Sequence, residues 1–140
     1  MRDRGHAAIE LALGVGVMLL PAAIVVLAFG PWTERKVAAE ALASEAAREA
    51  VLQLDQASGM AALQAQATGM GLHPGEVRVG WCGARPAPGS VGVCAMARGT
   101  VVAVSVEVWA PLISTPWGAV GGIWVEAGHS EPIDLYRSLG

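Results

Sequence analysis

Charge is scarce in this sequence. Only 15% of the 140 residues are charged, and nine Lys and Arg against twelve Asp and Glu give a formal net charge of −3. The basic residues are scattered, with no run longer than Arg35-Lys36. A surface that binds nucleic acid needs clustered Lys and Arg to neutralise phosphates. The composition therefore argues against a nucleic-acid partner.

Catalytic and metal-binding motifs are missing as well. The chain has no G-x-S-x-G, no Walker loop, no H-E-x-x-H and no paired carboxylates beside a base. His73 and His129 stand in no ligand-like pair and are expected at the surface. Glu107 and Glu126 are expected at solvent-facing strand positions. We therefore expect neither an enzyme nor a protein with a bound metal or other cofactor.

Cysteine is limited to Cys82 and Cys94, which enclose the Pro- and Gly-rich segment GARPAPGSVGV. A zinc site would need two more ligands at suitable spacing, and a redox pair would more usually read C-x-x-C. In an oxidising compartment the two thiols would close a ring of about 13 residues, which stabilises a fold by roughly 3 kcal/mol. We predict a structural disulfide.

One uncharged run is long enough to cross a membrane. Leu11 to Trp32 contains 22 residues without a charge, which as a helix spans roughly 33 Å against a hydrocarbon core of about 30 Å. Pro21 is expected to kink or loosen this helix, and Trp32 suits the membrane interface. The main alternative is a cleaved secretory signal, but its apolar region is usually only about 7–15 residues long. Its best cleavage site here, Ala28-Phe29-Gly30, is followed directly by Pro31.

The orientation of this span is nearly balanced by charge. Arg2 and Arg4 precede it, and Arg35 and Lys36 follow it, so the positive-inside count is close to a tie. We favour an N-terminus inside, because the N-terminal tail is only a few residues long and both cysteines lie in the C-terminal part.

The segment after Trp32 predicts more helix. TERKVAAEALASEAAREAVLQLDQ is rich in Ala, with Thr33 as a cap if the helix restarts after Pro31. A short second helix is predicted from Met60 to Thr68, closed by Gly69-Met70-Gly71. A modest apolar stripe could meet either a partner helix or the protein's own sheet, and the pattern does not decide between them. Its members are Val37, Ala38, Ala41, Leu42 and Val51.

The pattern changes to β from Glu76 onward. EVRVGW alternates, SVGVCAMA is a further candidate, and TVVAVSVEVW places four valines on one face. We expect a Pro-containing loop near Pro111–Pro116, a turn at Gly118–Gly122 and a last strand in IWVEAGHSEPI, ended by Pro132. The predicted fold class is α+β: a long N-terminal helix followed by a small antiparallel sheet of three or four strands. The four Trp residues after Trp32 are expected in the core or in subunit contacts.

The start of the chain carries a family resemblance. Gly5-His6-Ala7-Ala8-Ile9-Glu10 places a glutamate at the fifth position after a glycine, with basic residues before it and 22 uncharged residues after it. This arrangement resembles type IV prepilins. More narrowly, R-G-x-x-A-I-E-L-A-L, the short leader and the β-rich tail are similar to TadE-like minor pilins (pseudopilins) of the tight-adherence, or Flp-type, pilus system.

The resemblance implies a processing site and an assembly charge. Prepilin peptidase would cut between Gly5 and His6 on the cytoplasmic face and leave the apolar helix in place. The new ammonium at His6 would lie about one helical turn from Glu10. A carboxylate at mid-membrane costs about 2.5–3.5 kcal/mol, and less towards the surface. A neighbouring subunit's ammonium would offset that cost and set the register between helices, although a glutamate among lipid headgroups also needs no special role.

With the resemblance, the chain divides into a leader (1–5), a transmembrane helix (6–32), a helical extension with a second helix (33–75) and an extracytoplasmic β domain (76–140). The implied partners are the major Flp-type pilin, other minor pilins, prepilin peptidase, the Tad membrane assembly platform and membrane lipid. The implied location is a bacterial cytoplasmic membrane, crossed once, with a further place in the pilus.

Some features depart from the family pattern. Leu11 stands where Flp-type major pilins typically have Tyr and TadE-like chains often have Phe, and His6 is an uncommon first mature residue, which leaves its N-methylation open. The chain is also much larger than a major Flp pilin, which favours a minor, initiating or tip role. Two other interpretations remain: an uncleaved, membrane-anchored binding module outside the cytoplasm, and a secreted domain that loses everything before residue 31 or 44.

Overall fold

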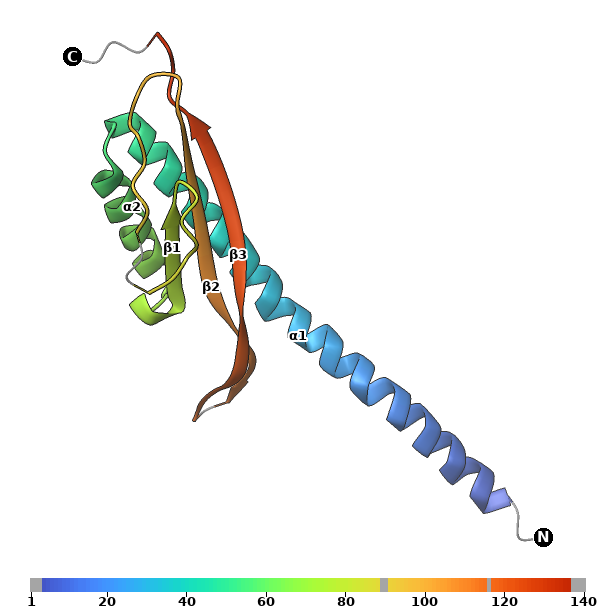
Figure 1. The fold of residues 1–140 in the computed structure, drawn as a ribbon. Coiled ribbons are helices and arrows are strands. Elements are labelled where there is room, and N and C mark those ends of the chain that lie inside the picture. Colours follow the sequence, from blue (N-terminus) through green and yellow to red (C-terminus); the bar gives the residue numbers. More distant parts are fainter. Residues whose placement is uncertain (1–3, 89–90, 116, 137–140) are drawn as a thin grey trace.

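The computed structural model describes residues 4–88, 91–115 and 117–136. Two helices lie on one face of a three-stranded antiparallel sheet with the order β1-β2-β3, and the first helix extends far beyond the sheet (Figure 1). The predicted α+β class and the long N-terminal helix are confirmed. The elements are α1 (Arg4–Gln53), α2 (Gln56–Gly69), η1 (Pro74–Glu76), β1 (Val77–Trp81), β2 (Val101–Thr115) and β3 (Gly118–Pro132).

Helix α1 continues through both of its prolines, Pro21 and Pro31. The helix does not restart after Pro31, so Thr33 is not the cap that a restart would have required. Its hydroxyl instead donates back to the carbonyl oxygens of Phe29 (3.1 Å) and Gly30 (2.8 Å) inside the helix. A proline removes one helical hydrogen bond, and the Ala-rich sequence that follows favours helix strongly enough to continue. The kink at Pro21 remains a prediction.

The C-terminal half of α1 forms the core with the sheet and α2. Its buried face consists mainly of alanines, whose small side chains allow the helix to approach the sheet closely. This face is rotated from the predicted stripe: Leu42 and Val51 are buried, but Val37 is exposed and Ala41 is only half-buried. Of the two partners considered for this helix, the structure provides the protein's own sheet. The fully buried residues are Ala39, Leu42, Ala43, Ala46, Ala47 and Ala50.

The sheet presents its predicted valine face to the helices. Val102, Val104, Val106 and Val108 on β2 are all buried, as the alternating pattern predicted. Their neighbours on β1 and β3 follow from the register, in which Trp81 pairs with Val104, and Val106 lies between Val79 and Ala127. Burial of each valine stabilises the fold by roughly 1.5–3 kcal/mol relative to exposure.

The β2–β3 hairpin is longer than predicted. Pro111 lies within β2 and pairs with Gly122, and β3 begins at Gly118, so the expected loop at Pro111 and the expected turn at Gly118–Gly122 are both wrong. Pro116 lies outside the described residues. Gly122 belongs to a strand because the Trp109 ring covers it: a Cβ there would lie 2.3 Å from Trp109 Cζ2. Glycine within a strand often marks such a close approach.

The connection between the helices also differs from the prediction. Helix α2 begins at Gln56 rather than at Met60, and Asp55 is its N-cap. Leu54 has a φ of 54°, and this left-handed backbone ends α1. In the segment predicted as a further strand, residues 91–97 are irregular, and the structure does not describe Ser90.

Candidate functional site: the exposed half of helix α1 and its junction with the domain

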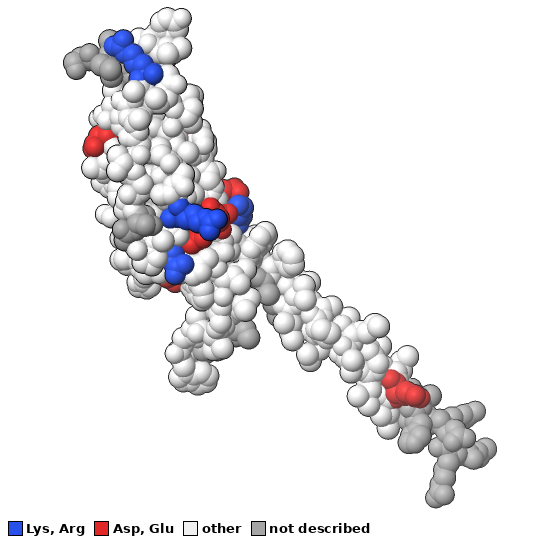
Figure 2. Space-filling model, viewed as in Figure 1, with Lys and Arg blue, Asp and Glu red and all other residues white. Residues whose placement is uncertain are grey.

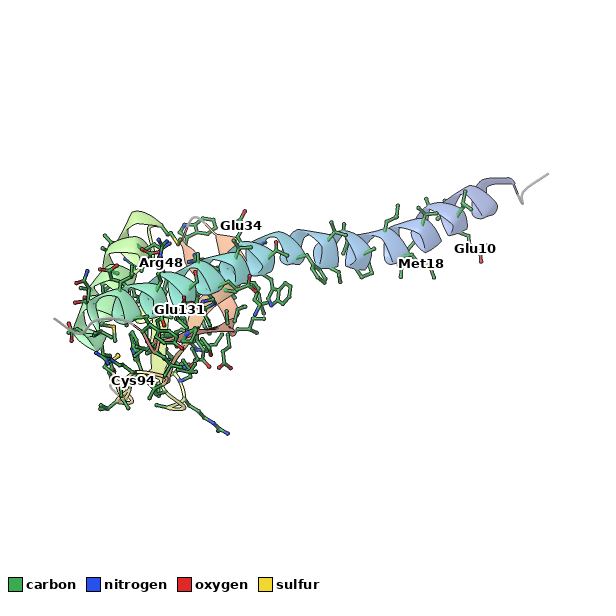
Figure 3. The ribbon with its side chains drawn as sticks, turned by 90° about the horizontal axis from the view of Figure 1, so that it is seen from above. Glu10, Met18, Glu34, Arg48, Cys94 and Glu131 are labelled. Atoms are coloured by element: carbon green, nitrogen blue, oxygen red, sulfur yellow. A yellow bond between two sulfur atoms is a disulfide. The ribbon has the colours of Figure 1, made fainter. Side chains whose placement is uncertain are left out.

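The N-terminal half of α1 stands alone, away from the domain (Figures 1 and 3). From Ile9 to Gly30, every side chain whose burial the structure describes is exposed. The helix is long and apolar enough to cross a membrane. Among the described residues, nothing else in the chain covers this surface, so its large apolar side chains need lipid or another protein around them.

Glu10 marks the outer end of this surface. Figure 3 labels Glu10 near the far end of the helix, and an uncharged stretch separates it from the domain. Figure 3 shows its carboxylate pointing away from the helix axis. Among the residues that the structure describes, no basic group forms an ion pair with it. Glu10 is therefore open to a partner from outside the chain.

The predicted cleavage residues lie just before Glu10. The backbone of Gly5 and His6 is helical, within the first turns of α1. Cleavage there would free an N-terminal ammonium on the same helix as Glu10. Because i and i+4 positions lie on one helix face, the ammonium and the Glu10 carboxylate would share a side of the helix end.

Polar contacts gather where α1 enters the domain. Trp32 is partly exposed and makes an edge contact with Phe29, with ring centroids 6.0 Å apart. One turn further, Lys36 Nζ donates a 2.7 Å hydrogen bond to the Glu126 carbonyl on β3 and lies 3.7 Å from Glu40 Oε1. These contacts fix β3 to the helix directly beyond the uncharged run.

The two cysteines form the predicted disulfide. Cys82 and Cys94 are bonded, with their Cα atoms 5.3 Å apart. The side-chain amide of Gln56 holds the second cysteine's segment against α2: Nε2 donates to the Gly92 carbonyl (2.7 Å), and Oε1 accepts from the Cys94 N–H (3.1 Å). The irregular segment around Gly92 and Cys94 is thus held by one disulfide and by the side-chain amide of Gln56.

The face of the sheet away from α1 carries a group that the sequence pattern did not reveal. Arg78 on β1 lies 3.7 Å from a carboxylate oxygen of Glu107, and its guanidinium carbon lies 3.6 Å from the ring centre of Trp124. Trp124 in turn contacts Trp109, with centroids 5.2 Å apart. Glu107 is therefore half-buried and paired rather than fully solvent-facing, whereas Glu126 is exposed as predicted. Only the strand register could have revealed this pairing.

Neither His73 nor His129 takes part in a metal-binding arrangement. His73 is exposed, and the half-exposed His129 lies 3.2 Å from Glu131 Oε2. Within the described ranges, no group of three or more His, Cys, Asp or Glu side chains could hold a metal ion. The expectation that the chain has no metal or cofactor remains a prediction.

One carboxylate has a perturbed acidity. Hydrogen bonds from the Ser58 hydroxyl (2.8 Å) and from the backbone N–H groups of Ala57 and Ser58 hold the pKa of Asp55 below its ordinary value of 3.8. Asp55 is the N-cap of α2, so this shift reflects helix capping rather than catalysis.

The site is thus an exposed apolar helix with one carboxylate near its end, joined to a disulfide-bonded domain. Comparisons of the chain with protein-family models, with curated proteins and with solved structures found no match.

Proposed function

We propose that this chain is a TadE-like minor pilin, a non-enzymatic subunit that prepilin peptidase processes between Gly5 and His6. Its N-terminal helix holds it in the bacterial cytoplasmic membrane and then packs with other pilin helices at the base or tip of a Tad pilus. The single observation that carries the proposal is the exposed half of α1, which ends at Glu10. The family resemblance of residues 4–13 adds the processing site.

The assembly step depends on charge pairing at Glu10. In lipid, an ionised carboxylate is costly, and an ammonium from a neighbouring processed subunit offsets that cost. Because both groups would lie within one turn of the helix end, the pair would hold two helices at a fixed axial offset. The apolar side chains from Leu11 to Trp32 would then be buried between subunits instead of in lipid.

The proposed topology places the N-terminus inside and the domain outside. Prepilin peptidase acts on the cytoplasmic side in the family that the sequence resembles, which requires Gly5 to lie there. The Cys82–Cys94 bond supports an exterior domain, because structural disulfides persist in oxidising compartments.

The test is the substitution Glu10→Gln, with Glu34→Gln as its matched control. Both residues are exposed glutamates on α1, but Glu34 lies beyond the uncharged run. We expect Glu10→Gln to leave processing and membrane insertion unchanged and to remove the protein from the sheared pilus fraction. Glu34→Gln should assemble like the unchanged protein. Normal assembly of the Glu10→Gln protein would refute the charge-pairing role.

A second candidate function rests on a different surface. A groove of about 590 Å³ lies between α2 and β1 and is lined mainly by apolar side chains, within the size range of small-ligand sites. It would suit an uncleaved, membrane-anchored binding module outside the cytoplasm. That alternative requires that the N-terminus is not cleaved and that Glu10→Gln leaves the function of the protein unchanged. Apolar groove residues include Met60, Leu63, Ala67, Leu72, Val77 and Val79.

A further inference from the structure

The closed end of the β2–β3 hairpin has no charged residues. The chain from Val108 to Val125 contains 18 residues without Asp, Glu, Lys or Arg, and Glu107 and Glu126 lie on either side of it. The described residues from Ala110 to Thr115 and from Trp117 to Ile123, here called the hairpin tip, project from the domain (Figure 1). Figure 2 shows no acidic or basic side chain on the projecting part.

The hairpin tip also exposes large apolar side chains. Trp117 is 93% exposed, Val120 is 60% exposed and Leu112 is 51% exposed. Single apolar residues at a surface are ordinary, whereas several large apolar side chains without charged neighbours mark a contact surface. The tip also lacks the charged side chains that usually prevent exposed strands from associating. We therefore expect its apolar surface to be covered by lipid or by another molecule.

Contacts between β3 and α1 show in which direction the tip points. Glu126 is bound to Lys36, and three residues further along β3, His129 lies in the same surface hollow as Ala41 and Ser44 of α1. The two elements, β3 and α1, therefore run parallel to each other. The N-terminal end of β3, at the tip, thus lies on the same side of the domain as the exposed N-terminal half of α1.

The strand is long enough to reach the level at which α1 would leave a membrane. Trp32 lies four residues before Lys36, which corresponds to about 6 Å along a helix. Gly118 lies eight residues before Glu126, which gives a strand about 26 Å long when extended. Figure 1 shows that the tip diverges from α1 and lies beside it at the same end of the domain. An inserted α1 would therefore bring the tip to the outer surface of the bilayer.

We infer that the hairpin tip is a second membrane contact, in which Trp117, Leu112 and Val120 enter the headgroup region of the leaflet from which α1 emerges. This inference rests on the membrane-spanning part of the proposed function, but not on pilus assembly. The side chains have the chemistry of an interfacial anchor, since Trp prefers the headgroup level and apolar neighbours bury their surface there. Glu107 and Glu126 set the limit of insertion, because a carboxylate is costly in lipid.

We favour lipid over a protein as the partner of the tip, because insertion of α1 would by itself place the tip at the membrane surface. The helix and the hairpin leave the domain at the same end, so one inserted element presents the other to the same surface. The contact would hold the domain against the membrane through two points and limit its rotation about α1.

The inference can be tested with the full-length chain in phosphatidylcholine vesicles, using lipids brominated close to the headgroup to quench tryptophan fluorescence. In the Trp32→Phe protein, quenching of Trp117 reports contact of the tip with lipid. The Trp32→Phe/Trp117→Phe protein gives the background quenching of the remaining Trp residues. We expect clear quenching in the first and loss of most of it in the second. Since Trp117 is almost fully exposed, its replacement by Phe should leave the fold intact.

A matched pair of charged variants locates the contact. Val120 and Val101 are similarly exposed, at 60% and 55%, but lie at opposite ends of the hairpin. In the Trp32→Phe background, Val120→Asp should weaken quenching of Trp117, and Val101→Asp should not.

The Trp117→Phe protein separates the two kinds of failure, because quenching of its Trp32 reports insertion of α1. Quenching of Trp32 without quenching of Trp117 would overturn the tip contact alone and leave the tip for a protein partner. Absence of both would also overturn the membrane span on which the proposed function depends. Equal effects of the two charged variants would contradict the position of the contact.

Discussion

Gly59 lies where α2 meets both α1 and the sheet, and an added methyl group there has nowhere to go. A Cβ at this position would lie 2.5 Å from the Ala46 carbonyl oxygen, 2.8 Å from Ala50 Cβ and 2.7 Å from Cη2 of Trp81. Trp81 is fully buried, and Ala46 and Ala50 belong to the buried face of α1. None of these atoms is the end of a flexible side chain, so α2 would have to move away.

Two opposing effects decide the stability of Gly59→Ala. At an unrestricted helix position the change from Gly to Ala stabilises a protein by about 1 kcal/mol. Overpacking of a tight core costs about 1–3 kcal/mol, and here three contacts are violated together. We expect the second effect to exceed the first, with a net loss of about 1–2 kcal/mol, or roughly 4–16 °C in Tm for a domain of this size.

Gly69→Ala is the matched control on the same helix. Gly69 is the last residue of α2, and nothing lies within 4 Å of a Cβ built there. The control should be neutral or stabilising by up to about 1 kcal/mol. Both variants would be unfolded with urea in detergent micelles as full-length chains, with tryptophan fluorescence as the signal. A Gly59→Ala protein as stable as the Gly69→Ala protein would refute the close packing of α2 against α1.

Three further predictions concern the disulfide segment and the cap of α2. Replacement of Gln56 by Ala removes both hydrogen bonds to Gly92 and Cys94, so the free energy of unfolding should fall by about 1–3 kcal/mol; an unchanged urea midpoint would contradict this role. Reduction of the Cys82–Cys94 bond should lower stability by roughly 3 kcal/mol, measured as the shift in urea midpoint with and without reductant, and Cys82→Ser/Cys94→Ser should be insensitive to reductant. The lowered pKa of Asp55 means that the unfolded chain takes up a proton at this residue at higher pH than the folded chain. Its contribution to stability is therefore complete above about pH 3.8 and is lost as the pH falls through the folded-state pKa. Asp55→Asn, which can still cap the helix, should remove this part of the acid dependence, and the difference in Tm between the two proteins from pH 5 to pH 2.5 measures it. A difference that does not change with pH would contradict the assignment.

The parts of the fold that sequence reasoning predicted are those with a strong local period. The run from Leu11 to Trp32 has no charge, and its exposed apolar side chains need lipid or another protein around them. The alternation from Val102 to Val108 places one apolar face on the core, whatever the neighbouring strands do. The cysteine pair also followed from simple elimination, because the two thiols have no further ligands near them.

The errors came from residues whose role depends on a distant partner. Gly118–Gly122 has the composition of a turn, but Trp109 from the opposite strand covers Gly122 and keeps it in the sheet. Val37 was assigned to the packed stripe, although the alanines on another face of α1 are the ones that fit against the sheet. In both cases a close approach between elements overrode the local signal.

One missed boundary did have a local signal. Asp55 followed three residues later by Ser58 is a capping pattern, and the structure uses both side chains at the start of α2. The Arg78, Glu107 and Trp124 group, by contrast, draws on three different strands. Its members are brought together only by the register, which the sequence does not specify by itself.

The most direct test of the proposed function is the intact mass of the protein purified from its host membranes without reductant, combined with mapping of its N-terminal peptide. The account predicts a chain that starts at His6 and is two hydrogens lighter than its reduced form, because of the Cys82–Cys94 bond. A chain that still carries residues 1–5 would contradict processing and favour the anchored binding module. A chain that begins beyond Gly30 would show that the apolar helix is a removed signal, which would overturn both the pilin function and the membrane contact of the hairpin.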